Sequence, residues 1–239
     1  IIKKLALILI FVLIILIYVT NIDNNIYYIS MGDSLAKGID PYDRIGYGYS
    51  DYIRDYFKEK NLLQMYTKEF TNNDYRTTDL IKDIESNKEE VVNNKKTTIK
   101  NALINADLVT ISIGKNDLFY KLGINSFNFN VNNVSNMYIY VDEITEDIEK
   151  LIKLVRKYCK EDIILIGYYN PLSNKASILA RNLEDVFLYA NQKIKNICIK
   201  NDIYFVDIYD IFKENPQYLP NPLDIHPSPE GYKVISDEI

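Results

Sequence analysis

The sequence is poor in the residues that build metal sites and disulfide frameworks, because its 239 residues include one histidine and two cysteines. Cys159 and Cys198 stand far apart and form no CxxC pair. Structural zinc sites need several Cys or His ligands, so we expect no metal and no other cofactor. The two cysteines are either a disulfide, which requires export, or two buried free thiols. A basic excess is also missing, since the net charge is -5, and this argues against a nucleic-acid partner.

Near the N-terminus, residues 5–19 form an apolar run without a charge. The run is about as long as the shortest membrane-spanning helices, and Lys3 and Lys4 before it favour an N-terminus that stays inside. We predict a retained membrane anchor with the rest of the chain outside the cytoplasm. The alternative is a signal peptide, whose removal makes the protein secreted, although no A-x-A-like site follows the run. Residues 1–25 are therefore an anchor or signal segment with its linker.

From residue 26 to residue 239 the pattern alternates between strands and helices, as expected for one α/β domain. Short apolar runs predict strands at residues 26–31, 62–70, 107–114, 162–171 and 203–209. Apolar residues at helical spacing predict helices at residues 49–59, 77–86, 137–159 and 176–200, and from residue 229 onward. This alternation predicts a central parallel sheet covered by helices on both faces. An Asn-rich loop over residues 124–136 carries no interpretable signature.

Three polar clusters lie at predicted strand ends or in adjoining loops, where functional residues of open parallel sheets gather. They are GDSL at residues 32–35, GKND at 114–117 and DIHP at 224–227. Each has an ordinary structural explanation, since Asp and Ser cap helices well and Gly, Asn and Asp are common in turns. Their occurrence together, in this order and with this spacing, favours a functional site over three unrelated structural turns.

The three clusters resemble the GDSL/SGNH hydrolase family, through GDSLAKG at residues 32–38, IGKND at 113–117 and DIHPSPEGY at 224–232. The resemblance covers nearly all of residues 26–239. It implies a three-layer α/β/α sandwich with a flavodoxin-like parallel sheet, and ester hydrolysis through an acyl-enzyme. Carried over by position, Ser34 is the nucleophile and His226 the general base. The backbone N–H of Ser34 and the side chain of Asn116 are the oxyanion-hole donors.

Simple chemistry agrees with these roles. A serine hydroxyl is a poor nucleophile until a base takes its proton, and imidazole titrates in the useful pH range. His226 is the only histidine in the chain, so a mechanism built on Ser34 has no other imidazole. Asn116 is neutral, and it can donate to a developing oxyanion without competing as a base.

The orienting carboxylate departs from the family pattern. In the family it usually stands three residues before the histidine, and Leu223 occupies that position here. We predict that Asp224, two residues before His226, holds the imidazole tautomer instead. The alternative is a Ser–His dyad in which a backbone carbonyl orients the ring.

A second departure concerns the stretch that supplies a glycine N–H to the oxyanion hole in the family, because Asp74 stands where that glycine is expected. The N–H of Asp74 is our third predicted donor, although its carboxylate would oppose an oxyanion unless it turned away. Asn73 and Arg76 are alternative substrate contacts nearby.

The neighbouring charged residues have other predicted roles. Asp33 and Asp117 are expected to accept backbone N–H bonds at helix starts, and Lys115 is expected to point into solvent. The sequence thus predicts a membrane-tethered esterase or lipase acting on acyl or acetyl esters of lipids or cell-wall glycans. A non-catalytic binding module on the same fold and an acyltransferase are the alternatives. No motif sets the oligomeric state.

Overall fold

A computed structural model of the protein describes residues 25–123, 136–172 and 178–239. The apolar run at residues 5–19, most of the Asn-rich loop and the start of the predicted helix at residue 176 lie outside this part. Among the described helices, none is both long enough and apolar enough to cross a membrane.

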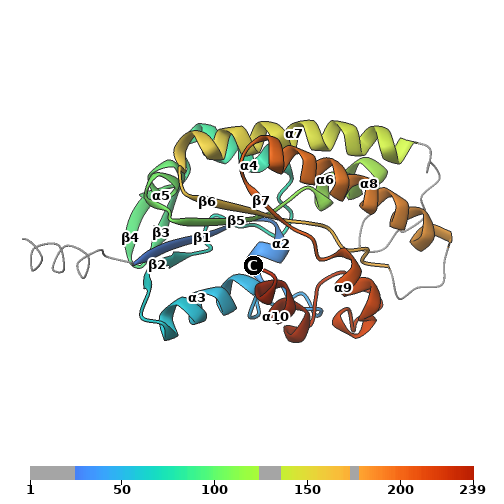
Figure 1. The fold of residues 1–239 in the computed structure, drawn as a ribbon, viewed down its shortest axis with the longest axis horizontal. Helices are drawn as coiled ribbons and strands as arrows, with labels where there is room; N and C mark the ends of the chain where they lie inside the picture. The colour runs from blue at the N-terminus through green and yellow to red at the C-terminus, as the bar shows by residue number, and fades with distance from the viewer. Residues whose placement is uncertain (1–24, 124–135, 173–177) are drawn as a thin grey trace, which may run out of the picture.

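The centre of the fold is a five-stranded parallel sheet in the order β2-β1-β5-β6-β7 (Figure 1). Its strands are β1 (Ile26–Gly32), β2 (Leu63–Thr67), β5 (Leu108–Ser112), β6 (Asp162–Ile166) and β7 (Tyr204–Val206). Counted along the chain within this sheet, the order is 2-1-3-4-5, which is that of flavodoxin-like folds. The sequence-based prediction of a parallel sheet between helices is confirmed.

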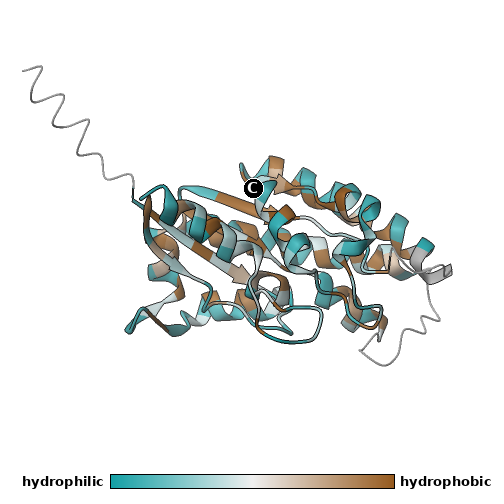
Figure 2. Cartoon of the chain, turned by 90° about the horizontal axis from the view of Figure 1, so that it is seen from below, coloured by the Kyte–Doolittle hydropathy of each residue, from teal (hydrophilic) through white to brown (hydrophobic). Residues whose placement is uncertain are grey.

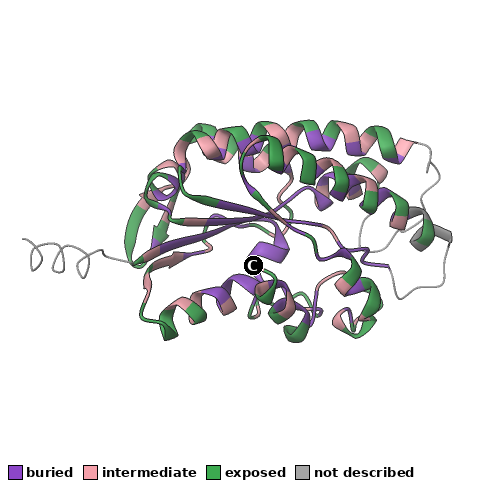
Figure 3. Ribbon diagram, viewed as in Figure 1, coloured by how far each residue is buried: buried purple, intermediate pink, exposed green. Residues whose placement is uncertain are grey.

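Helices cover both faces of the sheet, so the molecule has three layers (Figure 1). One face is covered by α4 (Thr77–Ser86), α5 (Ile99–Asn105), α7 (Met137–Tyr158) and α8 (Ile178–Lys200). The other is covered by α2 (Ser34–Lys37), α3 (Tyr49–Glu59), α9 (Tyr209–Glu214) and α10 (Pro229–Asp237). The strands are largely buried and the outer sides of the helices are exposed (Figure 3).

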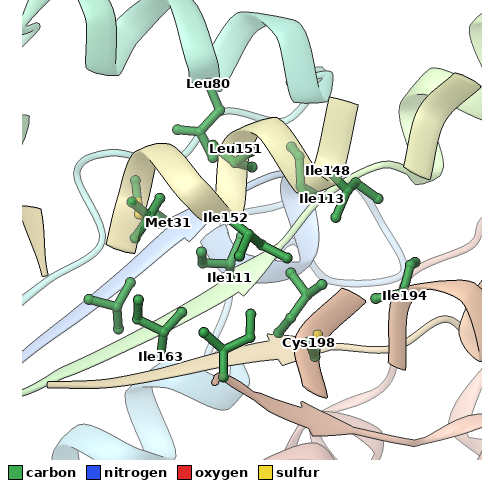
Figure 4. Packing of buried hydrophobic residues seen from close by; sticks show 14 of the residues in the cluster. Met31, Leu80, Ile111, Ile113, Ile148, Leu151, Ile152, Ile163, Ile194 and Cys198 are labelled. Carbon is green, nitrogen blue, oxygen red and sulfur yellow. The ribbon is translucent and has the colours of Figure 1, made fainter. Parts of the chain in front are cut away.

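The larger core lies between the sheet and α7. Buried residues of α7 recur at helical spacing on one side, namely Val141, Ile144, Ile148, Leu151, Ile152 and Val155. They pack against strand residues such as Met31, Ile111 and Ile163 (Figure 4). Each large aliphatic side chain buried in this way contributes about 1.5–3 kcal/mol. Hydrophilic residues occupy the opposite side of such helices (Figure 2), so the amphipathic pattern read from the sequence accounts for the layers.

Both cysteines are buried in this core as free thiols. Of the two alternatives for Cys159 and Cys198, the structure has the pair of thiols. Burial raises the pKa of both, that of Cys198 to about 12, so neither forms a thiolate readily.

The sequence did not predict several short elements. These are the antiparallel hairpin of β3 (Glu89–Val92) and β4 (Lys95–Thr98), the helices α5, α6 (Lys115–Leu122) and α9, and the short 3-10 helix η2 (Pro216–Tyr218). The hairpin turn consists of Asn93 and Asn94, both with positive φ. Two successive residues in this conformation make the turn that matches strand twist, so the Asn pair was the signal available in the sequence.

The sheet connections place two of the three polar clusters at one crevice. The chain leaves β1 toward β2 on one side, and after β2 it returns across β1 to reach β5. Ligands of open α/β sheets bind at the carboxyl ends of strands where the connections diverge in this way. Residues 33–35 follow β1 and residues 114–117 follow β5, so both clusters flank this point.

Candidate active site

The turn after β1 depends on a glycine. Gly32 has a φ of 122°, and a Cβ at this position would lie 1.9 Å from the carbonyl oxygen of Ser112. Any side chain would therefore separate β1 from β5 or reshape the turn. The next residue, Asp33, caps α2 by accepting a hydrogen bond from the N–H of Leu35 at 3.0 Å. Its carboxylate also accepts from the Ser112 hydroxyl at 2.8 Å, so the predicted capping role of Asp33 is observed.

Ser34 is the first residue of α2 and is 4% exposed. The N–H groups of the first helical turn have no carbonyl partner within the helix, so the N–H of Ser34 is available at the strand end. The Ser34 hydroxyl oxygen lies 2.8 Å from Nε2 of His226, across 192 positions of sequence. The spatial requirement for a Ser–His pair is therefore met.

Asp224 contacts the other side of the same imidazole. Its Oδ1 lies 2.8 Å from Nδ1 of His226 and accepts the backbone N–H of His226 at 2.7 Å. Burial raises the pKa of Asp224, but the hydrogen bond and charge of His226 outweigh this, so the pKa is below its ordinary value. An ionised carboxylate only accepts, so Nδ1 carries the proton and Nε2 is left to accept from Ser34. Leu223, at the usual family position, is 80% exposed.

The Asn116 amide is engaged with the loop before α4. Its Nδ2 donates to the carbonyl oxygens of Asn73 and Tyr75, both at 3.0 Å. In a trans peptide the C=O and N–H groups point in opposite directions, and the described chain has no cis peptide bond. The peptide that turns the Asn73 carbonyl to Asn116 therefore turns the N–H of Asp74 away from it. The structure brings Ser34, His226 and Asp224 together, and it holds the Asn116 amide on loop carbonyls, with the N–H of Asp74 turned away from Asn116.

Asp117 joins two helix starts. Its carboxylate accepts from the N–H of Thr77 at 2.9 Å and from the Thr77 hydroxyl at 3.0 Å. Burial raises the pKa of Asp117 to about 6, although these hydrogen bonds oppose the rise. Asp117 lies in the first turn of α6 and Thr77 is the first residue of α4. The predicted structural role of Asp117 is therefore observed, with the partner on a neighbouring helix.

The prediction that Lys115 points into solvent is wrong, because its side chain is buried and the residue is only 4% exposed. It is the first residue of α6 and follows Gly114, which has a φ of 102°. Burial lowers the pKa of Lys115, while the charges of Asp33 and Asp224 raise it. A single Lys between glycine and asparagine gives no periodic signal of burial, and this explains why the sequence did not reveal it.

The model of the GDSL-like lipase/acylhydrolase family matches residues 30–234. The chain belongs to this family. Among curated proteins, no sequence matches it.

Solved structures of lipases and esterases resemble this GDSL-like protein in fold. The lipase Lip_vut3 from a goat rumen metagenome is 19% identical with a TM-score of 0.68, over 88% of this chain and 94% of that one. An acetylxylan esterase, Axe2 from Geobacillus stearothermophilus, is 18% identical with a TM-score of 0.60, over 88% and 90%. An extracellular lipase from Streptomyces rimosus is 14% identical with a TM-score of 0.62, over 88% and 97%.

Within residues 25–123, 136–172 and 178–239, no group of three or more His, Cys, Asp or Glu residues could hold a metal ion.

One contact at the site was not predicted from the sequence: the Tyr169 hydroxyl donates to the carbonyl oxygen of Ile225 at 2.6 Å. Tyr169 follows β6 within an unremarkable Tyr pair, so no motif indicated it.

Proposed function

We propose that this GDSL-like protein is a carboxylic ester hydrolase in which Ser34 forms an acyl-enzyme. The observation that carries the proposal is the chain of contacts from Ser34 Oγ to His226 Nε2 and from His226 Nδ1 to Asp224, each 2.8 Å long. Among the described residues these contacts combine a hydroxyl nucleophile, a base and an orienting carboxylate, the arrangement that activates serine for acyl transfer.

In the proposed reaction, Ser34 Oγ attacks the ester carbonyl carbon while His226 Nε2 takes the hydroxyl proton. The resulting imidazolium is stabilised by Asp224 and then gives this proton to the departing alkoxide, so that an alcohol leaves and the acyl group stays on Ser34. Water next attacks the acyl carbon, with its proton passing to His226. Proton return to Ser34 releases the carboxylic acid and restores the enzyme.

The tetrahedral intermediates in this proposal carry an oxyanion, which requires preorganised donors. The N–H of Ser34 is available, and the Asn116 amide becomes available when it exchanges one of its two loop carbonyls for the oxyanion. The N–H of Asp74 joins them only if the Asn73–Asp74 peptide rotates. We therefore assign the oxyanion hole to Ser34 and Asn116, with Asp74 as a donor that depends on this rotation.

A fluorophosphonate probe tests the proposal, because it labels a serine only when a base has activated it. Incubation of the full chain should add one phosphonyl group, and peptide mass spectrometry should locate it on Ser34. Chain denatured by heat before the probe is added is the control and should stay unlabelled. A folded chain whose Ser34 remains unmodified would favour the non-catalytic binding module instead.

The proposed substrates are acyl or acetyl esters of lipids or cell-wall glycans. Support comes from the two lipases and the acetylxylan esterase that share the fold. Comparing the hydrolysis of acetylated xylan fragments with that of acylglycerols distinguishes glycan esters from lipid esters. If the protein hydrolyses neither, this substrate range is wrong.

We further propose that residues 5–19 anchor the protein to the cell membrane with the hydrolase domain outside the cytoplasm. The support is the charge-free run and the lysines that precede it. In a bacterial host, the full chain should remain in the membrane pellet after an alkaline carbonate wash, and protease added to spheroplasts should degrade it. A chain that remains intact inside spheroplasts would contradict the orientation, and a shortened N-terminus would indicate a cleaved signal peptide.

A further inference from the structure

A buried lysine contacts a ring that is hydrogen-bonded to the loop of the proposed triad. Lys115 is 4% exposed. It forms no salt bridge with the residues that the structure describes, and its Nζ lies 5.2 Å from the ring centroid of Tyr169. Removing a charged group from water is costly unless other groups compensate. The negative face of an aromatic ring attracts a cation, and this attraction strengthens when both groups are desolvated.

Tyr169 connects this cation to the loop of the proposed base. The Tyr169 ring stacks on Phe212 of α9, with centroids 4.4 Å apart and ring planes 14° apart. Its hydroxyl donates to the carbonyl oxygen of Ile225 at 2.6 Å. Ile225 lies between Asp224 and His226, so the loop that carries both side chains is hydrogen-bonded to the ring that Lys115 contacts.

Charged groups face Lys115 from two further segments. Burial holds the pKa of Lys115 below its ordinary value, and the charges of Asp33, in the turn after β1, and Asp224, in the loop before α10, oppose this effect. In return, Lys115 opposes the rise that burial causes in the pKa of Asp33, and His226 acts on Asp33 in the same direction. Lys115 and His226 therefore share two carboxylate neighbours, Asp33 and Asp224.

We propose that Lys115 is a positioning residue that acts on His226 in two ways, through Tyr169 and through its own charge. The contact with the Tyr169 ring supports the Asp224–His226 loop, and the ammonium group disfavours a second positive charge on the imidazole. This inference rests on the proposed function for its catalytic consequence, but its electrostatic part is a property of the folded chain alone.

The single histidine makes the electrostatic part directly measurable. In the full chain, held in detergent micelles and labelled with carbon-13 at the histidine ring, one NMR signal reports the protonation of His226. Lys115→Met keeps an apolar stem but removes the charge, so its titration midpoint should rise by about one pH unit. Lys121→Met is the matched control, because Lys121 is on the same helix and contacts the ring of Tyr140. It should leave the midpoint unchanged.

Lys115→Arg restores the charge and should return the midpoint toward that of the unmodified chain. A role of Lys115 in packing alone would leave the midpoint of folded K115M unchanged, and this result would overturn the proposal. It is independent of ester turnover, so failure of the proposed function at Ser34 and failure of this inference are distinguishable.

Tyr169→Phe provides a second test that does not depend on the folding of K115M. It keeps the ring and its contact with Lys115 but removes the hydrogen bond to Ile225. Loss of orientation should lower kcat by about 10- to 100-fold and change KM little, since small misplacements of reacting groups have effects of this size. Unchanged kcat in folded Y169F would show that the ring does not position the loop.

Discussion

Replacing Ser34 with alanine should lower kcat for p-nitrophenyl butyrate by about 10⁴- to 10⁶-fold, a loss typical of removing a serine nucleophile. The change deletes one oxygen, and that oxygen contacts His226 Nε2 at 2.8 Å. The fold should survive, because alanine is a good helix former and the cap of α2 comes from Asp33.

The control for this measurement is Ser86→Ala. Ser86 is exposed at the end of α4, and its hydroxyl donates to the carbonyl oxygen of Asp83 at 3.2 Å. Its variant should have the kcat and KM of the unmodified chain. Circular dichroism of both variants tests whether folding is retained. If folded S34A hydrolyses the ester at more than about a tenth of the original rate, Ser34 is not the nucleophile.

The size of the expected loss follows from how the hydroxyl is held. The turn from β1 into α2 fixes Ser34 at the strand end, and Gly32 allows this turn to lie against Ser112. His226 enters from a loop almost two hundred positions later. When Ser34 is removed, His226 has no hydroxyl to activate. The loss of kcat is therefore large, and the losses from removing each member of the pair do not add.

The sequence predicted the sheet and the Ser34–His226 contact for different reasons. Buried strands such as β1 and β5 are continuous apolar runs, which any parallel sheet covered on both faces requires. The Ser34–His226 contact was implied by the resemblance of three short motifs to the GDSL/SGNH hydrolase family. Neither inference needed knowledge of how individual side chains pack.

The remaining features depend on packing that no periodicity encodes. Lys115 is buried after a residue with positive φ, Gly114, and beside the ring of Tyr169, which belongs to the segment after β6. The engagement of Asn116 depends on which way one peptide in the loop of residues 73–75 faces. A one-dimensional pattern does not specify peptide orientation, so the sequence identified Asn116 as a donor but not its present acceptors.

The position of Asp224 shows the same limit on a smaller scale. Counting along the chain placed Leu223 where the family carboxylate usually stands, yet Leu223 is exposed to solvent. The backbone N–H of His226 donates to Asp224 Oδ1, which curls the segment enough for the same carboxylate to reach Nδ1. A tight local turn thus allows a spacing of two residues to serve the role that usually takes three.

Replacing Asp224 with asparagine should lower kcat by about 10⁴-fold, with KM nearly unchanged. The charge and hydrogen bond of His226 hold the pKa of Asp224 below its ordinary value, so the carboxylate is ionised throughout the neutral range and accepts the Nδ1 proton. An asparagine amide can instead donate to Nδ1. This stabilises the tautomer with its proton on Nε2, which cannot take the proton of Ser34.

The matched control is Asp210→Asn on the exposed side of α9, which removes the same charge away from the site. Its turnover should equal that of the unmodified chain. The comparison distinguishes a triad from a dyad, because a dyad oriented by a backbone carbonyl would need no carboxylate. A decrease in kcat of less than about tenfold in folded D224N would therefore assign the orientation of His226 to the backbone. A decrease near 10⁴-fold would instead identify Asp224 as the third member of the triad.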